Sequence, residues 1–301
     1  MSDQYHTAEP GILLRAPERF LIPCITPIIP GFCPIKREQF KKGSLLDITV
    51  FKIGSDAKGA KGGKHMNYLR EIRLSELPKS YAGRIPAIRY LFEMGGLKFQ
   101  KPVTLFVGEN GTGKSTLLEA IAVSLGFNAE GGSRDFSFST KDTHSDLGEV
   151  LTTVKSISPE DGFFLRAESF YNTASYLDRN STLLRYGGVS FHAQSHGESF
   201  LSLVTNRFEG NGLYILDEPE AALSPQRQLS LIAAIDDLVK HHSQFIIATH
   251  SPIIMAYPDA DVKLFSDRDI KSVSFRETEH YKITKEILDN PEQMMHYLLG
   301  R

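Results

Sequence analysis

The stretch Gly108-Glu-Asn-Gly-Thr-Gly-Lys-Ser115 fits the pattern G-x-x-x-x-G-K-[ST] in full. Glycines let such a loop turn tightly, so that successive backbone amides point inward at phosphate oxygens. An apolar strand is predicted over residues 103–107, directly before the loop, and a helix over 115–125 follows it. Because a helix N-terminus adds partial positive charge, this strand, loop and helix together predict a phosphate-binding loop.

Each side chain of the loop has an expected task. Lys114 is expected to reach the β- and γ-phosphates of a nucleoside triphosphate, and the Ser115 hydroxyl to bind Mg²⁺. The other positions expected to contact the nucleotide are Gly108, Asn110, Gly111, Thr112, Gly113 and Thr116. The alternative is a chance Gly-rich turn, a pattern expected in roughly one chain of this length in a hundred.

A second candidate segment, Leu213-Tyr-Ile-Leu-Asp-Glu-Pro219, is an apolar strand that ends in two carboxylates. Asp217 at the strand end is suited to the Mg²⁺ shell. Glu218, one residue further, is suited to accept a proton from an attacking water. With a phosphate-binding loop upstream, the pair predicts hydrolysis of the nucleotide rather than two solvated acids in a turn.

Two further segments carry polar groups at places where a phosphate could meet them. His250 in Thr-His-Ser-Pro follows another apolar strand, 32 residues after Glu218, and is expected to contact the γ-phosphate and the water. Ser195-His-Gly-Glu-Ser199 precedes a helix, so that the Ser195 hydroxyl and the Gly197 amide form a second phosphate-binding helix start. Since the loop already supplies one such start, the second suggests ATP held by another molecule.

These four segments, in this order and spacing, resemble ABC-type ATPases, and most of all their chromosome-maintenance and recombination-repair branch. Residues 67–301 are more narrowly similar to a family of short, stand-alone bacterial AAA or ABC-like ATPases. The stretches that carry the narrower resemblance are Pro102-Val-Thr-Leu-Phe-Val-Gly-Glu-Asn-Gly, Leu165-Arg-Ala-Glu-Ser-Phe, Ser195-His-Gly-Glu-Ser and Glu277-Thr-Glu-His-Tyr.

The resemblance implies a head-to-tail homodimer with two ATP molecules at its interface. In that dimer Ser195 and Gly197 act in trans, Asp217 assists Mg²⁺, Glu218 is the catalytic base and His250 is the switch histidine. The implied fold is α/β: a P-loop NTPase with an ABC-type nucleotide-binding domain, whose mainly parallel sheet is flanked by helices and joined to an N-terminal antiparallel β part.

The chain departs from the family pattern in two places. His196 stands where the usual signature has its first Gly, and no Leu precedes Ser195. The loop that usually offers a Gln to Mg²⁺ and water corresponds to residues 166–169, where Glu168 takes that role. The resemblance also implies a dimer-contacting loop at residues 221–224, and Tyr90 is the candidate for stacking on adenine.

Composition bounds the organisation and the partners. The formal net charge of −2 gives no support for nucleic-acid or membrane binding, although nucleic acid stays open as a partner. Residues 1–65 hold ten Lys or Arg against six Asp or Glu and are predicted to form an irregular basic extension, or a basic arm for an acidic partner. The ATPase domain is predicted over 66–301. Four prolines interrupt the apolar stretch 20–35, so no membrane segment is predicted, and the two cysteines fit a cytoplasmic protein.

The coarse pattern is β-rich at first and then alternates strands with helices, which predicts a parallel sheet covered on both faces. Strands are expected over residues 68–74, 103–107, 161–167, 213–216, 244–249 and 262–265, with short strand or turn material over 87–99. Helices are expected over 115–125, 198–207, 225–241, 279–290 and 292–299.

Two other functions stay open. A P-loop kinase or GTPase is disfavoured because the guanine-reading Asn-Lys-x-Asp segment is absent and Asp-Glu-Pro followed by a histidine is foreign to both. An ATP-binding adaptor could instead act with an unseen protein partner in DNA repair or defence. Ser115 and Ser195 are 80 positions apart, and the segment between them holds no long coiled coil, which excludes a long-armed chromosome clamp.

Overall fold

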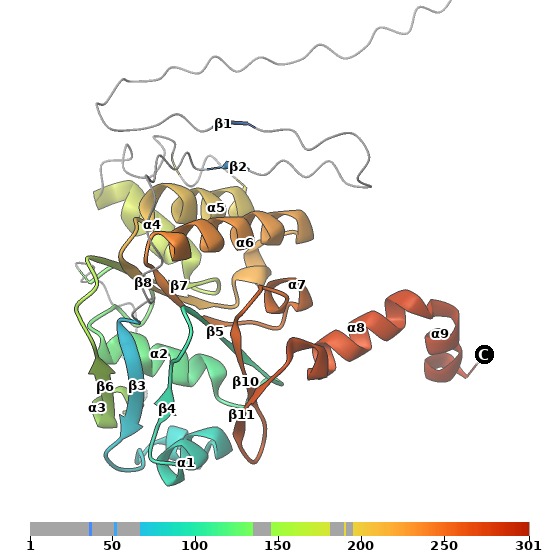
Figure 1. Ribbon diagram of the computed structural model, residues 1–301, viewed down its shortest axis with the longest axis horizontal. Coiled ribbons are helices and arrows are strands. Elements are labelled where there is room, and N and C mark those ends of the chain that lie inside the picture. The colour runs from blue at the N-terminus through green and yellow to red at the C-terminus, as the bar shows by residue number, and fades with distance from the viewer. Residues whose placement is uncertain are drawn as a thin grey trace, which may run out of the picture. The chain divides into compact units, whose positions relative to one another are not determined.

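The computed structural model describes residues 36–37, 51–52, 67–134, 146–180, 190 and 195–300, all within the unit Ile35–Arg301 (Figure 1). Of the predicted extension 1–65, the described part is an antiparallel ladder of β1 (Lys36–Arg37) with β2 (Phe51–Lys52). The remainder of that extension lies outside the described residues, and its boundary at residue 65 stays a prediction.

A six-stranded sheet runs through the described domain. In spatial order its strands are β11 (Ile270–Val273), β10 (Asp261–Phe265), β5 (Val103–Val107), β9 (Gln244–Ala248), β8 (Gly212–Asp217) and β7 (Asp161–Arg166). Each neighbouring pair from β10 to β7 is parallel, whereas β11 pairs antiparallel with β10. The carboxyl ends of parallel strands meet at one edge, so the segments that follow β5, β7, β8 and β9 gather there.

Helices cover both faces of this sheet (Figure 1). The bounds of the described helices are α1 (Pro86–Glu93), α2 (Lys114–Ser124), α3 (Leu147–Val150), α4 (Phe170–Asn180), α5 (His196–Arg207), α6 (Pro225–Lys240), α7 (Pro252–Met255), α8 (Glu279–Asp289) and α9 (Pro291–Leu299), of which α8 and α9 project away from the sheet (Figure 1). Short 3₁₀ turns, η1 (Tyr81–Arg84), η4 (Pro219–Ala222) and η5 (Phe275–Glu277), connect them.

Alternate residues of each central strand enter two separate hydrophobic cores. In β9, Ile246 packs into the core shared with α1, α2 and the small sheet, whereas Phe245 and Ile247 pack into the core shared with α4, α5 and α6. Every residue of β5, β8 and β9 is buried, which explains why these strands are mostly apolar rather than alternating between apolar and polar residues.

A three-stranded antiparallel sheet of β4 (Leu97–Lys98), β3 (Leu69–Leu74) and β6 (Leu151–Lys155) lies beside the large one. The buried Gln244 side chain on β9 joins the two sheets, since its amide oxygen accepts from the Leu69 N–H and its amide nitrogen donates to the Leu69 carbonyl, both at 2.9 Å. The predicted fold class is therefore confirmed: α/β, with a mainly parallel sheet flanked by helices and a separate antiparallel sheet, whose strand β6 follows β5 in the chain.

The expectation of strand or turn material over residues 87–99 is wrong for most of its length. Residues Pro86–Glu93 form α1, with Pro86 in the first turn, where its missing N–H costs nothing. Ala87, Ile88 and Leu91 are the buried residues of this helix, a spacing that suits a helical face. The helix α4 and the strands β6 and β11 were also not predicted.

The predicted C-terminal helices are present as α8 and α9, but neither buries a residue. Their large exposed apolar side chains are Ile283, Leu288, Met295, Tyr297, Leu298 and Leu299. Among the residues that the structure describes, no helix combines the length and the apolar character that crossing a membrane requires.

Candidate active site

The predicted phosphate-binding loop connects the buried strand β5 to α2. Gly108, Gly111 and Gly113 have φ angles of 146°, 81° and 98°, which other residues rarely adopt. A Cβ on Gly108 would lie 2.2 Å from the Phe265 carbonyl oxygen, and one on Gly113 would lie 2.6 Å from Ile85 Cγ2. The loop therefore needs glycine at these two positions both for conformation and for space.

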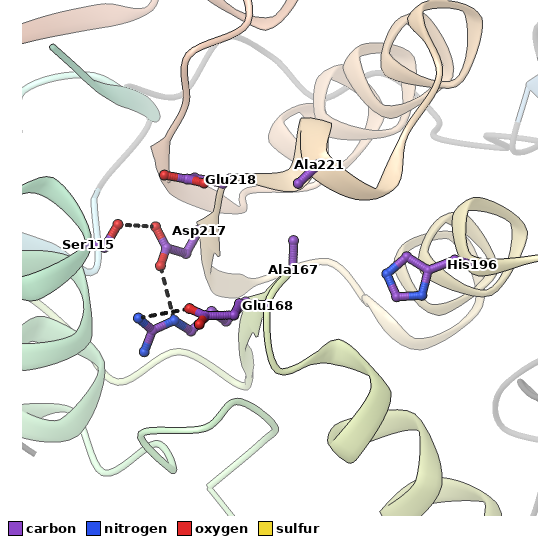
Figure 2. A pocket seen from close by; sticks show the side chains of 8 residues that line it. Ser115, Ala167, Glu168, His196, Asp217, Glu218 and Ala221 are labelled. Carbon is purple, nitrogen blue, oxygen red and sulfur yellow. Dashed lines mark hydrogen bonds and ion pairs between the residues drawn. The ribbon is translucent and has the colours of Figure 1, made fainter. Parts of the chain in front are cut away.

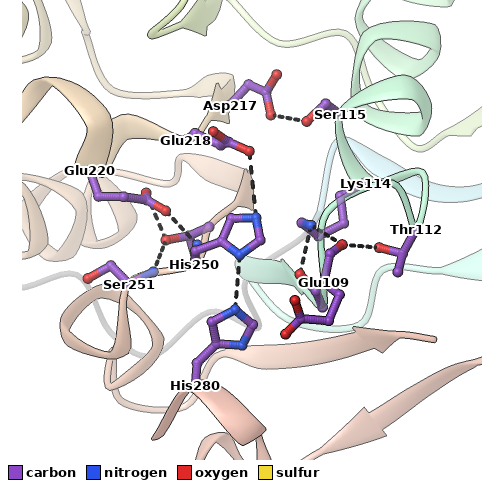
Figure 3. Close-up of polar contacts among 12 residues, drawn as sticks. Glu109, Thr112, Lys114, Ser115, Asp217, Glu218, Glu220, His250, Ser251 and His280 are labelled. Atoms are coloured by element: carbon purple, nitrogen blue, oxygen red, sulfur yellow. Dashed lines mark hydrogen bonds and ion pairs between the residues drawn. The ribbon is translucent and has the colours of Figure 1, made fainter. Parts of the chain in front are cut away.

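Lys114 lies folded over this loop, and its side chain is almost fully buried. Its Nζ donates to the carbonyl oxygens of Gly108 at 2.7 Å and Glu109 at 2.9 Å (Figure 3). Burial lowers the pKa of the Lys114 amino group, while the nearby carboxylates of Glu218 and Asp217 raise it. A buried cation held above positive-φ glycines at a helix N-terminus fits the phosphates of a nucleotide.

The remaining loop positions differ in exposure. Glu109 and Asn110 are exposed at the tip, and Thr112 is buried, with its hydroxyl donating to the Glu109 carbonyl oxygen at 2.8 Å. Thr116 is half-buried in the first turn of α2. Of these residues, Asn110, Thr112 and Thr116 are predicted contacts, and they lie on the same short segment as Lys114 and Ser115.

The predicted metal pair lies side by side at the sheet edge. The Ser115 hydroxyl donates to Asp217 Oδ1 at 2.9 Å, joining the start of α2 to the end of β8 (Figure 2). Burial raises the pKa of Asp217 to about 6, although Arg166 and the Ser115 hydroxyl lower it. A hydroxyl and a carboxylate are oxygen ligands of the kind that Mg²⁺ prefers, so this pair fits the ion.

Arg166, at the end of β7, is a site residue that the sequence analysis missed. Its Nε lies 3.3 Å from Asp217 Oδ2, and its Nη1 donates to Glu119 Oε2 at 2.8 Å. Glu168, the predicted substitute for a glutamine, lies 3.6 Å from Arg166 Nη2, and its side chain is 85% exposed. Arg166 therefore balances the negative charge of the carboxylates around the metal pair.

Glu218 adopts a left-handed conformation, with φ 49° and ψ 51°, which is uncommon for a residue with a side chain. Its backbone N–H donates to the Ala248 carbonyl oxygen at 2.9 Å, which fixes it against the end of β9. His250 Nε2 lies 3.6 Å from Glu218 Oε1 (Figure 3). The predicted base and the predicted switch histidine thus face each other across the site.

Burial and the nearby Lys114 amino group both lower the pKa of His250, so its imidazole is neutral at neutral pH. Glu220, also missed in the sequence analysis, holds the turn that carries this histidine. Its carboxylate accepts from the Thr249 hydroxyl at 2.8 Å and from the His250 backbone N–H at 2.5 Å. Glu220 follows Glu218 closely in sequence, but nothing in the pattern says where its side chain points.

The Ser195–Ser199 segment begins α5 as predicted. Ser195 is exposed and forms a capping box with Glu198, while its hydroxyl accepts from Arg227 Nη1 at 3.3 Å. Gly197 is buried, and a Cβ there would lie 2.7 Å from the Ala222 carbonyl oxygen. This glycine therefore has a packing role against η4 in addition to any phosphate contact.

A pocket of about 350 Å³ opens among these elements (Figure 2). It is lined by Ser115, Arg166, Ala167, Glu168, His196, Asp217, Glu218 and Ala221. The pocket therefore lies between the metal pair, the predicted base Glu218, and His196 in the first turn of α5. Tyr90, the candidate for stacking on adenine, is half-buried on α1 and packs against the hydrophobic core, and its role toward adenine stays a prediction.

The strand, glycine loop and helix, with carboxylates at the end of a nearby strand, define a P-loop nucleotide-binding protein. The profile of the AAA domain family matches residues 91–297, and the chain belongs to that family. The predicted resemblance to AAA-like P-loop ATPases is thereby confirmed, and the family and the site together support nucleotide binding and hydrolysis.

Solved structures similar to this chain include the SMC head domain from Thermotoga maritima, at 16% identity over 69% of this chain and 99% of that chain, with a TM-score of 0.39. Another is cbiO1 from Clostridium perfringens, part of the ABC transporter complex cbiONQ, at 18% identity over 78% and 99%, with a TM-score of 0.41. Both scores are low, so we draw no conclusion from them. Among curated proteins, none matches this sequence.

Proposed function

We propose that this chain binds ATP with Mg²⁺ and hydrolyses it to ADP and phosphate, within a head-to-tail homodimer that encloses the nucleotide and acts as a conformational switch. The observation that carries the proposal is the meeting of Ser115, Asp217, Glu218 and His250 at one edge of the sheet, next to the buried Lys114. These groups come from three separate strand ends, so their convergence is a property of the fold.

The proposed roles follow from where each side chain lies. Lys114 and the loop amides bind the phosphates, and Ser115 and Asp217 would hold Mg²⁺, which supplies charge stabilisation at the phosphates when bound. Glu218, half-exposed to the pocket, accepts the proton of the attacking water. His250 Nε2 donates toward the γ-phosphate. Glu168 is proposed to contact the nucleotide or its water shell from the pocket wall.

The proposed dimer rests on the Ser195 helix start. Ser195 is exposed at the N-terminus of α5, an end that attracts anions. The loop before α2 already binds the phosphates of the nucleotide held by the same chain. The exposed N-terminus of α5 is therefore suited to the nucleotide held by a second copy. In that arrangement Ser195 and Gly197 complete the partner's site.

The test combines two variants with a measurement of how the ATPase rate depends on protein concentration. We expect Glu218→Gln to stabilise an ATP-bound dimer, seen by light scattering as a doubled mass, and Lys114→Ala to abolish both nucleotide binding and the dimer. We also expect the wild-type ATPase rate per molecule to rise with protein concentration. A Glu218→Gln protein that binds ATP but stays monomeric would contradict the enclosed dimer.

A second candidate function is an ATP-binding adaptor that acts through another protein. The observation that favours it is α8 with α9, which bury no residue and expose apolar side chains such as Leu288 and Tyr297. Pull-down of the native protein with and without ATP separates this candidate from a self-contained switch. A cytoplasmic location remains part of the proposal, and a rate measurement with and without DNA tests nucleic acid as a partner.

A further inference from the structure

The first turn of α8 brings a second histidine to the site. His280 Nε2 lies 2.9 Å from His250 Nδ1, and the two ring centres are 5.0 Å apart at an angle of 57° (Figure 3). The two residues are 30 positions apart in the sequence. At this distance the two nitrogens share one hydrogen, so one ring donates and the other accepts.

The direction of this hydrogen bond decides what His250 can do on its other side. A neutral imidazole carries one N–H, and the bond made by one nitrogen sets the state of the other. His250 Nε2 is buried, has no hydrogen-bond partner among the described residues, and faces Glu218 Oε1 at 3.6 Å. A lone pair on Nε2 would be repelled by the Glu218 carboxylate, whereas an N–H at the same position would be attracted to it. The geometry therefore favours His280 as the donor and His250 as the Nε2–H tautomer.

The placement of His280 is fixed by Thr278, the N-cap residue of α8, rather than by the histidine ring itself. Thr278 is fully buried and caps α8, accepting from the Tyr281 N–H at 3.3 Å and donating to the Phe275 carbonyl oxygen at 2.6 Å. Its hydroxyl also lies 3.8 Å from the sulfur of Met255, on α7. Since α7 starts two residues after His250, the first turn of α8 is tied to the segment that carries the switch histidine.

We propose that His280 is a positioning residue that holds His250 in the Nε2–H tautomer, with its donor aimed at the reacting edge of the site. The inference rests on the proposed function, because it gives His250 a donor role toward the γ-phosphate. It extends the site to α8, an element outside the phosphate-binding loop and the two strand ends. Its consequence is that chemistry at β8 and β9 depends on the seating of the C-terminal helices.

The test uses three variants and two readouts. His280→Phe keeps a planar ring without a donor, His280→Gln restores a donating nitrogen near the Nε2 position, and His296→Phe makes the same ring change on α9, away from the site. The first readout is the tautomer of His250 in nucleotide-free protein, from ¹⁵N–¹H spectra of histidine-labelled samples, with the resonance assigned through His250→Gln. The second readout is steady-state ATP hydrolysis.

We expect the wild type, His280→Gln and His296→Phe to show the Nε2–H tautomer, and His280→Phe to show a mixture of both. We expect His280→Phe to lower kcat by about tenfold or more while the KM for ATP changes less than about twofold, since donor geometry rather than binding is lost. His280→Gln should recover most of that loss. The proposal is overturned if His280→Phe keeps the wild-type tautomer of His250, or if kcat of His280→Gln falls as far as that of His280→Phe.

The two readouts separate this inference from the proposed function. A wild-type protein that hydrolyses no ATP contradicts the proposed function, yet the tautomer of His250 still reports whether His280 sets it. If the wild type hydrolyses ATP but the His250 tautomer is unchanged in His280→Phe, only the positioning role of His280 is contradicted.

Discussion

The Ser115 hydroxyl lies 2.9 Å from Asp217 Oδ1, although the two residues are 102 positions apart in the chain. The contact joins the first turn of α2 to the carboxyl end of β8, two strands away from β5 in the sheet. This contact lies at the edge of the sheet where the proposed metal ion and the phosphates would be held.

Ser115→Ala removes one of the two proposed ligands of Mg²⁺. We expect wild-type protein to bind ATP more tightly with Mg²⁺ than without it, and the variant to lose most of that difference, about tenfold or more in affinity. Isothermal titration with ATP, with and without Mg²⁺, measures this. Ser124→Ala, at the other end of α2, is the matched control because its hydroxyl donates only locally, to the Ile121 carbonyl oxygen. Equal Mg²⁺ dependence in both variants would contradict the assignment.

Gly197→Ala tests the packing role of the glycine at the start of α5. The new Cβ would lie 2.7 Å from the Ala222 carbonyl oxygen and 2.8 Å from Arg227 Nη1, so backbone must move. We expect the free energy of unfolding to fall by about 1 to 3 kcal/mol in urea denaturation. Gly148→Ala is the control, since its closest contact is a Val123 methyl at 3.2 Å, and it should cost less. A larger loss in Gly148→Ala would count against this account.

The strands and helices that could be predicted are those whose pattern is local. Val103–Val107 is short, apolar and followed by glycine, and α6 begins with Ser224 and Pro225 in capping positions. The helix α1 was missed because its apolar face, at Ala87, Ile88 and Leu91, covers only two turns, and short apolar runs do not separate helix from strand.

The candidate site divides in the same way. Lys114 begins the helix after the phosphate-binding loop, and Asp217 and Glu218 follow one another at the end of β8, so local motifs predict all three positions. Arg166 and His280 reach the site through tertiary packing, from the end of β7 and the start of α8, and no spacing rule connects them to Asp217 or His250. Arg166 and His280 both lie inside segments that carry the family resemblance. The resemblance identifies these segments but does not say which residues their side chains contact.

Asp217 predicts how stability changes with pH. Its pKa in the folded protein is raised to about 6, above the ordinary value of 3.8, because burial disfavours the charged form. The folded state therefore binds more protons between pH 4 and 6, and the free energy of unfolding falls as the pH rises through that window. Asp217→Asn should remove this fall, on the order of 2 kcal/mol, in protein without Mg²⁺ or nucleotide.

Urea denaturation of Asp217→Asn at several values between pH 4 and 7 measures the effect. Glu168→Gln, which changes an exposed carboxylate near the same arginine, is the control and should keep the wild-type slope. Parallel curves for wild type and Asp217→Asn would show that Asp217 titrates normally in the folded protein.

Two substitutions of Glu220 distinguish the effect of losing a hydrogen-bond acceptor from the effect of losing a negative charge. In Glu220→Ala the Thr249 hydroxyl and the His250 N–H lose their shared acceptor, which we expect to cost about 1 to 3 kcal/mol of stability and to lower kcat by releasing His250. In Glu220→Gln the amide oxygen can accept from the His250 N–H, and the amide nitrogen can donate to the Thr249 oxygen. The Gln variant should therefore stay within about 1 kcal/mol of wild type and keep most of its rate. Urea denaturation and steady-state hydrolysis measure both quantities, and a Gln variant as weak as the Ala variant would mean that the negative charge, rather than the hydrogen bonds, holds the histidine turn.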